Sequence, residues 1–211
     1  TRADLADLAA LRKAFAAANP DIVFHMAAQP LVRLSYREPL ETLQTNFMGT
    51  AHVLDVLRTS SKKVPCIVIT SDKCYENREI DYGYQEHDPM GGSDIYSMSK
   101  GACELLTTAY RKSFQLPLAS GRAGNVIGGG DYAEDRIIPD CVRALAAGKP
   151  VVLRNPGSIR PWQHVLEPVS GYLVLGEKLL GGGAPAFYDG WNFGPKEEKV
   201  DVETLAGLFL K

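Results

Sequence analysis

The first half of the chain alternates between helical stripes of apolar residues and short, continuous apolar runs. Residues 4–18 carry one helical stripe, formed by Leu5, Leu8, Leu11 and Phe15. This spacing predicts an amphipathic helix, which is expected to stop at Asn19-Pro20 because proline cannot continue the hydrogen-bond ladder. The next run, 22–28, is apolar apart from His25 and predicts a strand buried on both faces.

The same two patterns repeat as far as residue 127. Helical patterns cover 39–58 and 94–114, a continuous apolar run covers 64–70, and a further strand is expected over 118–127. Strands that alternate with helices in this order are typical of a parallel sheet with helices on its faces. In such sheets the ligand site lies beyond the carboxyl ends of the strands, so the residues that follow each strand are the candidates for function.

From Asp131 onward the pattern becomes less regular. It predicts helices at 138–147 and 165–180, and strands at 151–154 and 187–193. We expect this part to be a smaller substrate-binding region, partly interleaved with the main sheet. The predicted division of the chain is therefore 1–130 and 131–211.

Composition narrows the classes of function. The 211 residues carry 25 acidic and 23 basic side chains and are 45% hydrophobic, which is ordinary for a globular protein. A nucleic-acid binder would need a basic surplus, and no apolar run approaches the roughly 20 residues that span a bilayer, so neither partner is expected. The four cysteines and four histidines show no metal-site spacing, and we expect reduced, mostly buried thiols in a cytoplasmic protein.

Tyr96 and Lys100 are four residues apart near the start of a predicted helix and therefore share one face. A phenol with a pKa of about 10 is a poor base, but a neighbouring ammonium favours the phenolate and makes a general base plausible. The alternative is an ordinary solvent-facing pair, because this spacing is common. Ser71, Asp72 and Lys73 favour the functional interpretation, since they follow the preceding strand and can face Tyr96.

Each of these three residues has a possible role. Ser71 could bind the same substrate hydroxyl as Tyr96, Asp72 could act as an acid, and Lys73 could act as a second base or an electrostatic clamp. The alternative is a Ser-Asp turn with an exposed lysine.

The glycine-rich segments do not predict a nucleotide-binding turn. Gly121, Gly124 and Gly128 lie in a late strand, whereas a dinucleotide fingerprint opens a helix after the first strand.

Arginines in the second region suit a diphosphate-bearing ligand: Arg136, Arg154 and Arg160.

Four segments resemble the extended short-chain dehydrogenase/reductase superfamily in order and spacing: His25-Met-Ala-Ala28, Asn46-Phe-Met-Gly-Thr50, Tyr96-Ser-Met-Ser-Lys100 and Arg122-Ala-Gly-Asn125. Two more resemble its CDP-glucose 4,6-dehydratase branch: Thr70-Ser-Asp-Lys-Cys-Tyr-Glu-Asn77 and Arg160-Pro-Trp-Gln-His164. The resemblance implies a Rossmann-like doubly wound sheet and an NAD-binding part at 1–130, with a nucleotide-sugar-binding part at 131–211.

It also implies a reaction: dehydration of CDP-glucose to CDP-4-keto-6-deoxyglucose by C4 oxidation, loss of water across C5 and C6, and return of the hydride to C6. Tyr96, assisted by Lys100, would remove the C4 hydroxyl proton, and Asp72 would protonate the departing C6 hydroxyl. Many related dehydratases carry Glu as the C5 base where this chain has Lys73. That departure leaves the C5 base open.

The resemblance assigns further residues to ligands. On the cofactor side these are Asp4, Leu5, Ala27, Ala28, Gln29 and Asn46, beside Tyr96 and Lys100. On the substrate side they are Asn125, Arg136, Arg160 and Asn192, beside Ser71. Three alternatives share much of this pattern: a nucleotide-sugar 4-epimerase, a nucleotide-sugar decarboxylase, and a non-catalytic dinucleotide-binding regulator.

The ends of the sequence carry one more expectation. The chain begins at Thr1 inside a helical pattern, ends at Lys211 inside another, and lacks the glycine-rich turn of a dinucleotide-binding sheet. We therefore expect a fragment of a longer enzyme that is homo-oligomeric when complete. On its own it is expected to expose a sheet edge and bind NAD poorly.

Overall fold

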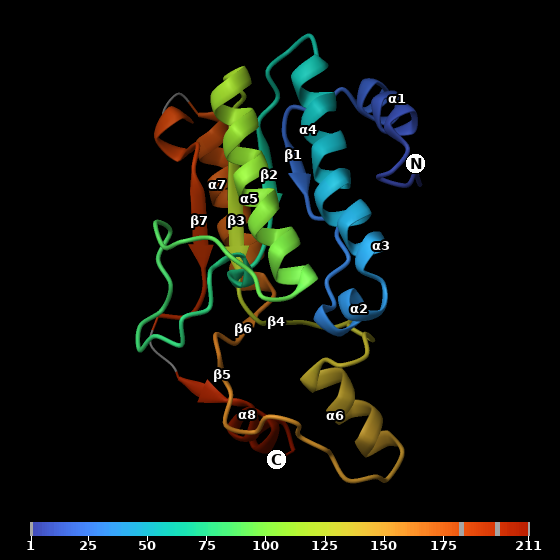
Figure 1. The fold of residues 1–211 in the computed structure, drawn as a ribbon, viewed down its shortest axis with the longest axis vertical. Helices are drawn as coiled ribbons and strands as arrows, with labels where there is room; N and C mark the ends of the chain where they lie inside the picture. The colour runs from blue at the N-terminus through green and yellow to red at the C-terminus, as the bar shows by residue number, and fades with distance from the viewer. Residues whose placement is uncertain (1, 182–183, 197–198, 211) are drawn as a thin grey trace. The chain divides into compact units, whose positions relative to one another are not determined.

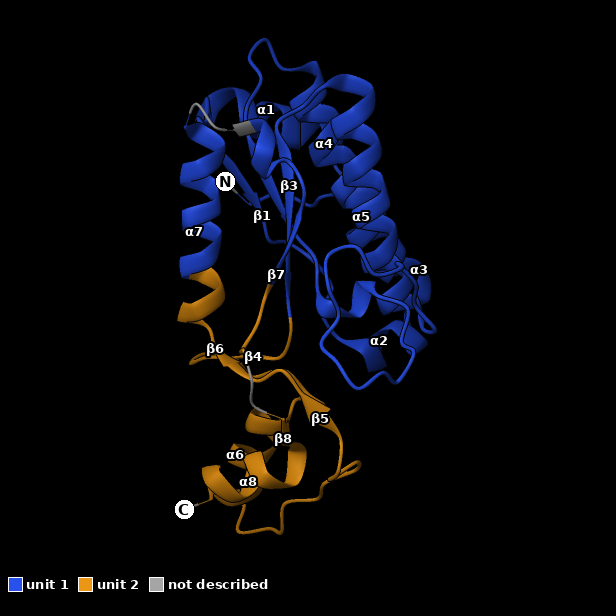
Figure 2. Ribbon diagram, turned by 90° about the vertical axis from the view of Figure 1, so that its left-hand side faces the viewer, with its two compact units in different colours: residues 1–123, 170–192 blue, residues 124–169, 193–211 orange. Residues whose placement is uncertain are grey.

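The structure is a computed structural model that describes residues 2–181, 184–196 and 199–210. Thr1 and Lys211, on which the expectation about the chain ends depends, lie outside the described residues. The chain forms two compact units, one of residues 1–123 with 170–192 and the other of residues 124–169 with 193–211 (Figure 2). Each unit is described by itself below.

Unit 1 contains a sheet of four strands in the order β1-β2-β3-β7. The strands are β1 (Val23–His25), β2 (Cys66–Ile69), β3 (Leu118–Ala123) and β7 (Gly190–Phe193). β1 pairs with β2 in parallel, and β2 pairs with β3 in parallel. The predicted parallel sheet is therefore confirmed.

Helices cover both faces of this sheet. One face carries α1 (Leu8–Ala18), α4 (Gly49–Thr59) and α5 (Ile95–Phe114), and α7 (Leu166–Leu180) lies on the other (Figures 1 and 2). The core beneath α4 and α5 is fully apolar and almost completely buried: Leu54, Leu57, Val64, Cys66, Val68, Leu116 and Leu118. This arrangement confirms the doubly wound, Rossmann-like α/β fold.

The helix predicted over 39–58 is confirmed, because helical residues run without a break from 39 to 59 as α3 (Pro39–Leu43), the π-helical turn η1 (Gln44–Met48) and α4. A further short helix, α2 (Val32–Arg37), precedes it and was not predicted. The π turn matters for function because π turns are frequent at functional sites, and this one carries Asn46.

Other predicted bounds shift for local reasons. The first helix begins at Leu8 rather than residue 4, because the Asp7 carboxylate caps it by accepting the N–H of Ala10 at 2.9 Å. The strand predicted over 118–127 stops at Ala123. The strand predicted at 187–193 begins only at Gly190, after the 3-10 turn η3 (Ala184–Phe187).

Unit 2 is built from short elements. β4 (Val126–Ile127) pairs in parallel with β6 (Gln163–His164), and β5 (Ile159–Arg160) pairs antiparallel with β8 (Val200–Asp201). Its helices are α6 (Ile137–Ala146) and α8 (Val202–Phe209). The strand predicted at 151–154 does not form: no strand among the described residues pairs with this stretch, and Val152 is exposed.

The units divide the chain differently from the predicted boundary at residue 130. Residues 124–130 belong to unit 2 and residues 170–192 belong to unit 1, so the two parts are interleaved in sequence. The assignment of NAD binding to 1–130 and of substrate binding to 131–211 concerns function and stays a prediction. In the part of the chain that the structure describes, every helix is too short or too polar to cross a membrane.

Candidate active site

Tyr96 and Lys100 lie in the first turns of α5, which begins next to the end of β2. The Asp94 carboxylate caps the helix by accepting the N–H of Ser97 at 2.9 Å and its hydroxyl at 2.6 Å. Both side chains are buried, with Tyr96 7% exposed and Lys100 5% exposed. The Lys100 ammonium lies 5.9 Å from the centre of the Tyr96 ring. The pair is therefore not the solvent-facing pair that the sequence left open.

The Lys100 ammonium has an unusual environment for a lysine. Nζ donates to the carbonyl of Ile69, the last residue of β2, at 3.3 Å. Burial lowers the pKa of Lys100, while the charge of Glu104 acts in the opposite direction. A cation in this place favours the ionised form of the neighbouring phenol.

Ser71, Asp72 and Lys73 form the turn between β2 and the following loop. Asp72 and Lys73 lie in the 3-10 turn η2 (Asp72–Cys74), which the Ser71 hydroxyl caps by accepting the N–H of Lys73 at 3.2 Å. Ser71 also donates to the Asp72 carboxylate at 3.0 Å, and Lys73 Nζ lies 4.0 Å from the same carboxylate. The side chains of Asp72 and Lys73 remain 28% and 40% exposed, so a ligand can reach them.

Gly101 brings this turn and α5 together. A Cβ at Gly101 would lie 3.2 Å from the carbonyl oxygen of Cys74 and 2.8 Å from that of Gly91. Only a residue without a side chain lets the helix pack directly on the turn. The predicted catalytic residues Ser71, Asp72 and Lys73 are thus on a turn that contacts the helix of Tyr96 and Lys100.

The residues predicted for the cofactor side follow β1. Ala28 is partly buried and Ala27 is exposed, so this stretch offers small side chains beside an open surface. The buried Asn46 amide fixes the next residue, because it accepts the N–H of Gln29 at 2.7 Å and donates to its carbonyl at 3.1 Å. Asn46 Nδ2 also donates to the Ser99 hydroxyl of α5 at 2.9 Å. Asn46 therefore fixes the backbone of Gln29 on the predicted cofactor side.

Asp4 and Leu5 lie before α1 and not in a helix. The exposed Asp4 carboxylate accepts the N–H of Ala6 at 2.8 Å, and Leu5 packs on Gly49, where an added Cβ would lie 2.9 Å from the Leu5 side chain. Their predicted contact with the adenine stays a prediction.

The predicted substrate contacts are divided between the units. In unit 2, Arg136 pairs with Asp131 at 3.7 Å, Arg160 Nη1 donates to the carbonyl of Ile159 at 2.7 Å, and Asn125 accepts the N–H of Gln163 through its carbonyl at 3.0 Å. In unit 1, Asn192 uses both side-chain atoms within the protein: Oδ1 accepts the Tyr75 hydroxyl and Nδ2 donates to the carbonyl of Tyr84. All four assignments stay predictions.

Sequence reasoning missed a buried ion pair next to these groups. Glu104 on α5 and Arg122 on β3 are 4% and 6% exposed, and their nearest atoms are 2.8 Å apart. Glu104 also accepts hydrogen bonds from the hydroxyls of Thr70 and Ser120. A sequence signal existed, because Tyr96, Lys100 and Glu104 repeat at intervals of four along one helix.

His25 is the last residue of β1, and the charge of Lys100 acts on it. It is 6% exposed, and its Nε2 lies 3.0 Å from the Thr50 hydroxyl. Burial, aided by the charge of Lys100, lowers the pKa of His25 to about 4. The imidazole is therefore neutral in the folded protein at neutral pH.

This shift predicts a pH dependence of stability. The unfolded chain binds the proton of His25 below about pH 6.5, but the folded chain binds it only near pH 4, so the stabilisation is lost as the pH falls through this window. The shift corresponds to about 3 kcal/mol in the free energy of unfolding. Urea unfolding at pH 7.5 and 4.5 should show this loss in the wild type and a smaller loss in His25→Asn. The exposed His87→Asn serves as the control; an equal loss in all three proteins would contradict the prediction.

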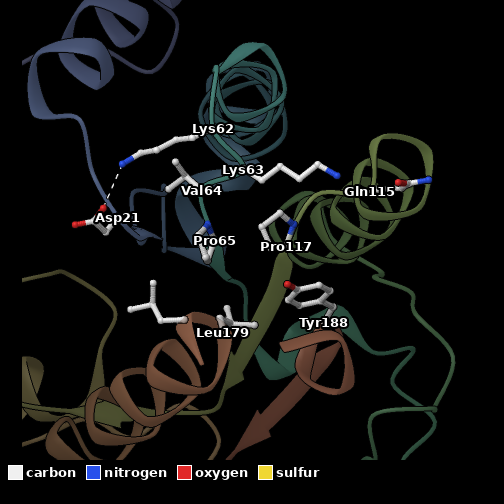
Figure 3. Close-up of a pocket in the computed structure, with 10 residues that line it drawn as sticks. Asp21, Lys62, Lys63, Val64, Pro65, Gln115, Pro117, Leu179 and Tyr188 are labelled. Carbon is white, nitrogen blue, oxygen red and sulfur yellow. Dashed lines mark hydrogen bonds and ion pairs between the residues drawn. The ribbon is translucent and has the colours of Figure 1, made fainter. Parts of the chain in front are cut away.

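Three other features do not add to the site. All four cysteines are free and buried, and burial raises the pKa of the Cys66 thiol to about 12. Among the described residues, no cluster of His, Cys, Asp and Glu could hold a metal ion. A cavity of about 640 Å³ lies beside residues that precede the strands, including Val64, Pro117 and Tyr188 (Figure 3). It is therefore at the opposite end of the sheet from Tyr96.

Comparisons with known proteins were made for the whole chain. A family model described as GDP-mannose 4,6 dehydratase matches residues 1–178. A curated CDP-glucose 4,6-dehydratase of Salmonella typhimurium is 54% identical, over 96% of this chain and 58% of the relative. A dTDP-glucose 4,6-dehydratase of Haemophilus influenzae is 28% identical, over 97% of this chain and 61% of the relative. The chain thus spans about three-fifths of these curated relatives.

Solved structures share the fold. A dTDP-glucose 4,6-dehydratase from Streptomyces venezuelae with NAD bound superposes with a TM-score of 0.85 at 23% identity, covering 99% of this chain and 61% of that one. A UDP-glucose 4-epimerase from Thermotoga maritima gives the same TM-score at 20% identity, covering 99% of this chain and 66% of that one. At these identities the likeness concerns the fold alone. The same fold is shared by a dehydratase and a 4-epimerase.

Proposed function

This chain belongs to the GDP-mannose 4,6 dehydratase family, and on that premise we propose that the protein is an NAD-dependent nucleotide-sugar 4,6-dehydratase that acts on CDP-glucose. The observation that carries the proposal is the buried Tyr96–Lys100 pair on the helix that packs against the turn of Asp72 and Lys73. The 54% identity to a CDP-glucose 4,6-dehydratase supports the choice of nucleotide. The predicted homo-oligomeric state and cytoplasmic location stay predictions.

The residues present fit NAD. An ammonium has three donors, and within the described residues the hydrogen bond to Ile69 is the one that buried Lys100 makes, so it retains donors for ligand hydroxyls. Tyr96, Lys100, Ala27, Ala28, Gln29 and Asn46 would hold the nicotinamide half, and Asp4 and Leu5 the adenine. When bound, NAD supplies a hydride acceptor at C4 of the sugar and a hydride donor at C6.

The chain's own residues move the protons. Tyr96 removes the C4 hydroxyl proton as a phenolate that the Lys100 ammonium favours, and Ser71 binds the same hydroxyl. The 4-keto group acidifies C5, so its proton can leave to a base while Asp72 protonates the C6 hydroxyl, which leaves as water. Lys73 Nζ lies 4.0 Å from the Asp72 carboxylate, and Lys73 is the group we assign to C5 in place of the glutamate of related dehydratases. Asn125, Arg136 and Arg160 are the proposed contacts to the nucleotide diphosphate.

The experiment that tests this function supplies the full-length protein with CDP-glucose and NAD in deuterium oxide. A dehydratase should give a 4-keto-6-deoxy product with deuterium at C5, because the C5 proton leaves to a base and a solvent-derived one replaces it. Nuclear magnetic resonance of the product distinguishes the outcomes. Formation of CDP-galactose alone would identify a 4-epimerase, and absence of any 4-keto product would refute dehydration. Matched reactions with dTDP-glucose and GDP-mannose test the nucleotide assignment.

A further inference from the structure

Tyr75 is a buried residue that the proposed mechanism does not use. It is 4% exposed and follows directly after the turn of Asp72 and Lys73. Its hydroxyl accepts a hydrogen bond from Arg122 Nη1 at 2.8 Å and donates one to Asn192 Oδ1 at 2.6 Å. Burial raises the pKa of Tyr75 to about 12, so the hydroxyl keeps its proton and its role as a donor at neutral pH.

The two partners of Tyr75 come from the sheet and also bind the loop 76–93, which leads to α5. Arg122 Nη1 donates to the carbonyl of Glu86 at 2.9 Å. Asn192 donates to the carbonyl of Tyr84 through Nδ2 at 2.8 Å, and its N–H donates to the Glu86 carboxylate at 2.9 Å. This chain of hydrogen bonds, which we call the Tyr75 clasp, joins β3, β7 and the loop through Arg122, Tyr75 and Asn192.

Two further contacts make the clasp rigid. The rings of Tyr75 and Tyr84 stack with their centres 5.3 Å apart. The Arg122 guanidinium is held by the Glu104 carboxylate on its other side, and Gly190 leaves it room, since a Cβ there would lie 2.1 Å from Arg122 Nη2. The anchor of the clasp is therefore fixed by the sheet and by α5.

The clasp connects to the reacting groups through the backbone. The N–H of Tyr75 donates to the carbonyl of Asp72 at 3.4 Å, and the carbonyl of Cys74 accepts the N–H of Gly91 at 2.9 Å. Asp72 and Lys73 are only partly buried, and their side chains pair with each other. The position of the turn backbone, and not side-chain packing, therefore determines where these two groups stand relative to Tyr96.

We propose that Tyr75 is a positioning residue: through Arg122 and Asn192 its hydroxyl holds the loop 76–93 and the turn of Asp72 and Lys73 in the geometry that the elimination step needs. This inference rests on the proposed function. It also gives Asn192 a role on the loop, in place of the predicted role on the substrate.

Tyr75→Phe in the full-length protein tests the proposal, because it removes the hydroxyl and keeps the stacked ring. We expect kcat for the 4-keto product to fall about 10-fold, the size expected when one hydrogen bond that positions Asp72 and Lys73 is lost, with KM changed less than about 2-fold. The matched control is Tyr82→Phe, an exposed tyrosine in the same loop, which should leave kcat unchanged.

A second measurement does not depend on turnover. Arg78 is the one Lys or Arg between Lys73 and Lys100, so native-state trypsin cleavage of this loop has a single site. Tyr75→Phe should accelerate cleavage at Arg78 about 10-fold relative to wild type and Tyr82→Phe, detected by mass spectrometry as a new terminus at Glu79. Asn192→Leu should reproduce both effects, and the double variant should lose little more than either single variant.

The outcomes separate the two proposals. Unchanged cleavage at Arg78 in Tyr75→Phe would overturn the clasp whatever the activity. Faster cleavage with an unchanged kcat would restrict Tyr75 to folding and overturn its positioning role. A raised KM in Asn192→Leu, with a rate of cleavage at Arg78 equal to that of the wild type, would support the predicted substrate contact of Asn192 and overturn the clasp. An inactive wild type refutes the proposed function, and the cleavage rates still decide whether the clasp holds the loop.

Discussion

Tyr96→Phe should remove nearly all formation of the 4-keto product and leave ligand binding largely intact. The phenyl ring fills the same buried space beside Lys100, but it has no oxygen to take the C4 hydroxyl proton. General acid–base groups contribute about 100- to 10,000-fold to rate, so a fall of this size is expected in kcat. Steady-state kinetics and calorimetric titration with the nucleotide sugar measure the two quantities separately.

Tyr110→Phe provides the matched control for this change. Tyr110 lies on the same helix, and its ring packs at the edge of the core below α4 and α5, away from the carboxyl ends of the strands. The same loss of one hydroxyl should there leave kcat close to wild type. Full activity in Tyr96→Phe would remove Tyr96 from the mechanism, and an equal loss in both variants would point to damage to the fold.

Arg122→Leu should produce a large loss of stability. Removing one partner of a buried pair leaves Glu104 as an uncompensated buried charge, which costs about 3–5 kcal/mol in the free energy of unfolding. Burial disfavours the charge of Arg122, but the Glu104 carboxylate outweighs it and the pKa of Arg122 is raised. Denaturant unfolding of the variant at neutral pH measures the loss.

The ion pair of Arg78 with Glu76 is the comparison for Arg122. Both of its side chains are about half exposed, so Arg78→Leu should cost less than about 1 kcal/mol. Replacing both buried partners, as in Glu104→Leu with Arg122→Leu, should recover part of the lost stability, because Glu104 then no longer remains as a buried charge without Arg122. Equal losses for Arg78→Leu and Arg122→Leu would contradict this account of the buried pair.

The sequence placed the central elements well and their ends less well. A buried parallel strand needs a continuous apolar run, and this requirement located β1 and β2; the helix over 94–114 was located to within one residue of α5. Caps and turns set the ends instead, as at Asp7, and an isolated apolar stretch such as 151–154 forms no strand without a neighbour to bond to.

The same contrast holds for the site. Tyr96 and Lys100 could be paired from their spacing, and Ser71, Asp72 and Lys73 from their place after a strand, because helix periodicity and strand direction are local properties of a chain. Asn192 could not be interpreted in this way, since its side-chain partners, Tyr75 and Tyr84, lie more than 100 residues away in the sequence.

By itself, the sequence determined that this protein has a parallel α/β sheet with a Tyr/Lys pair and a Ser-Asp-Lys turn at its carboxyl edge. Only the tertiary structure decided that this pair is buried, that Glu104 and Arg122 neutralise each other behind it, and that Tyr75 ties the loop to the sheet. The physical reason is the separation along the sequence between the residues that interact. Apolar periodicity follows from neighbours along the chain, whereas the burial of a charge and the partner that satisfies it depend on which distant strands and helices meet.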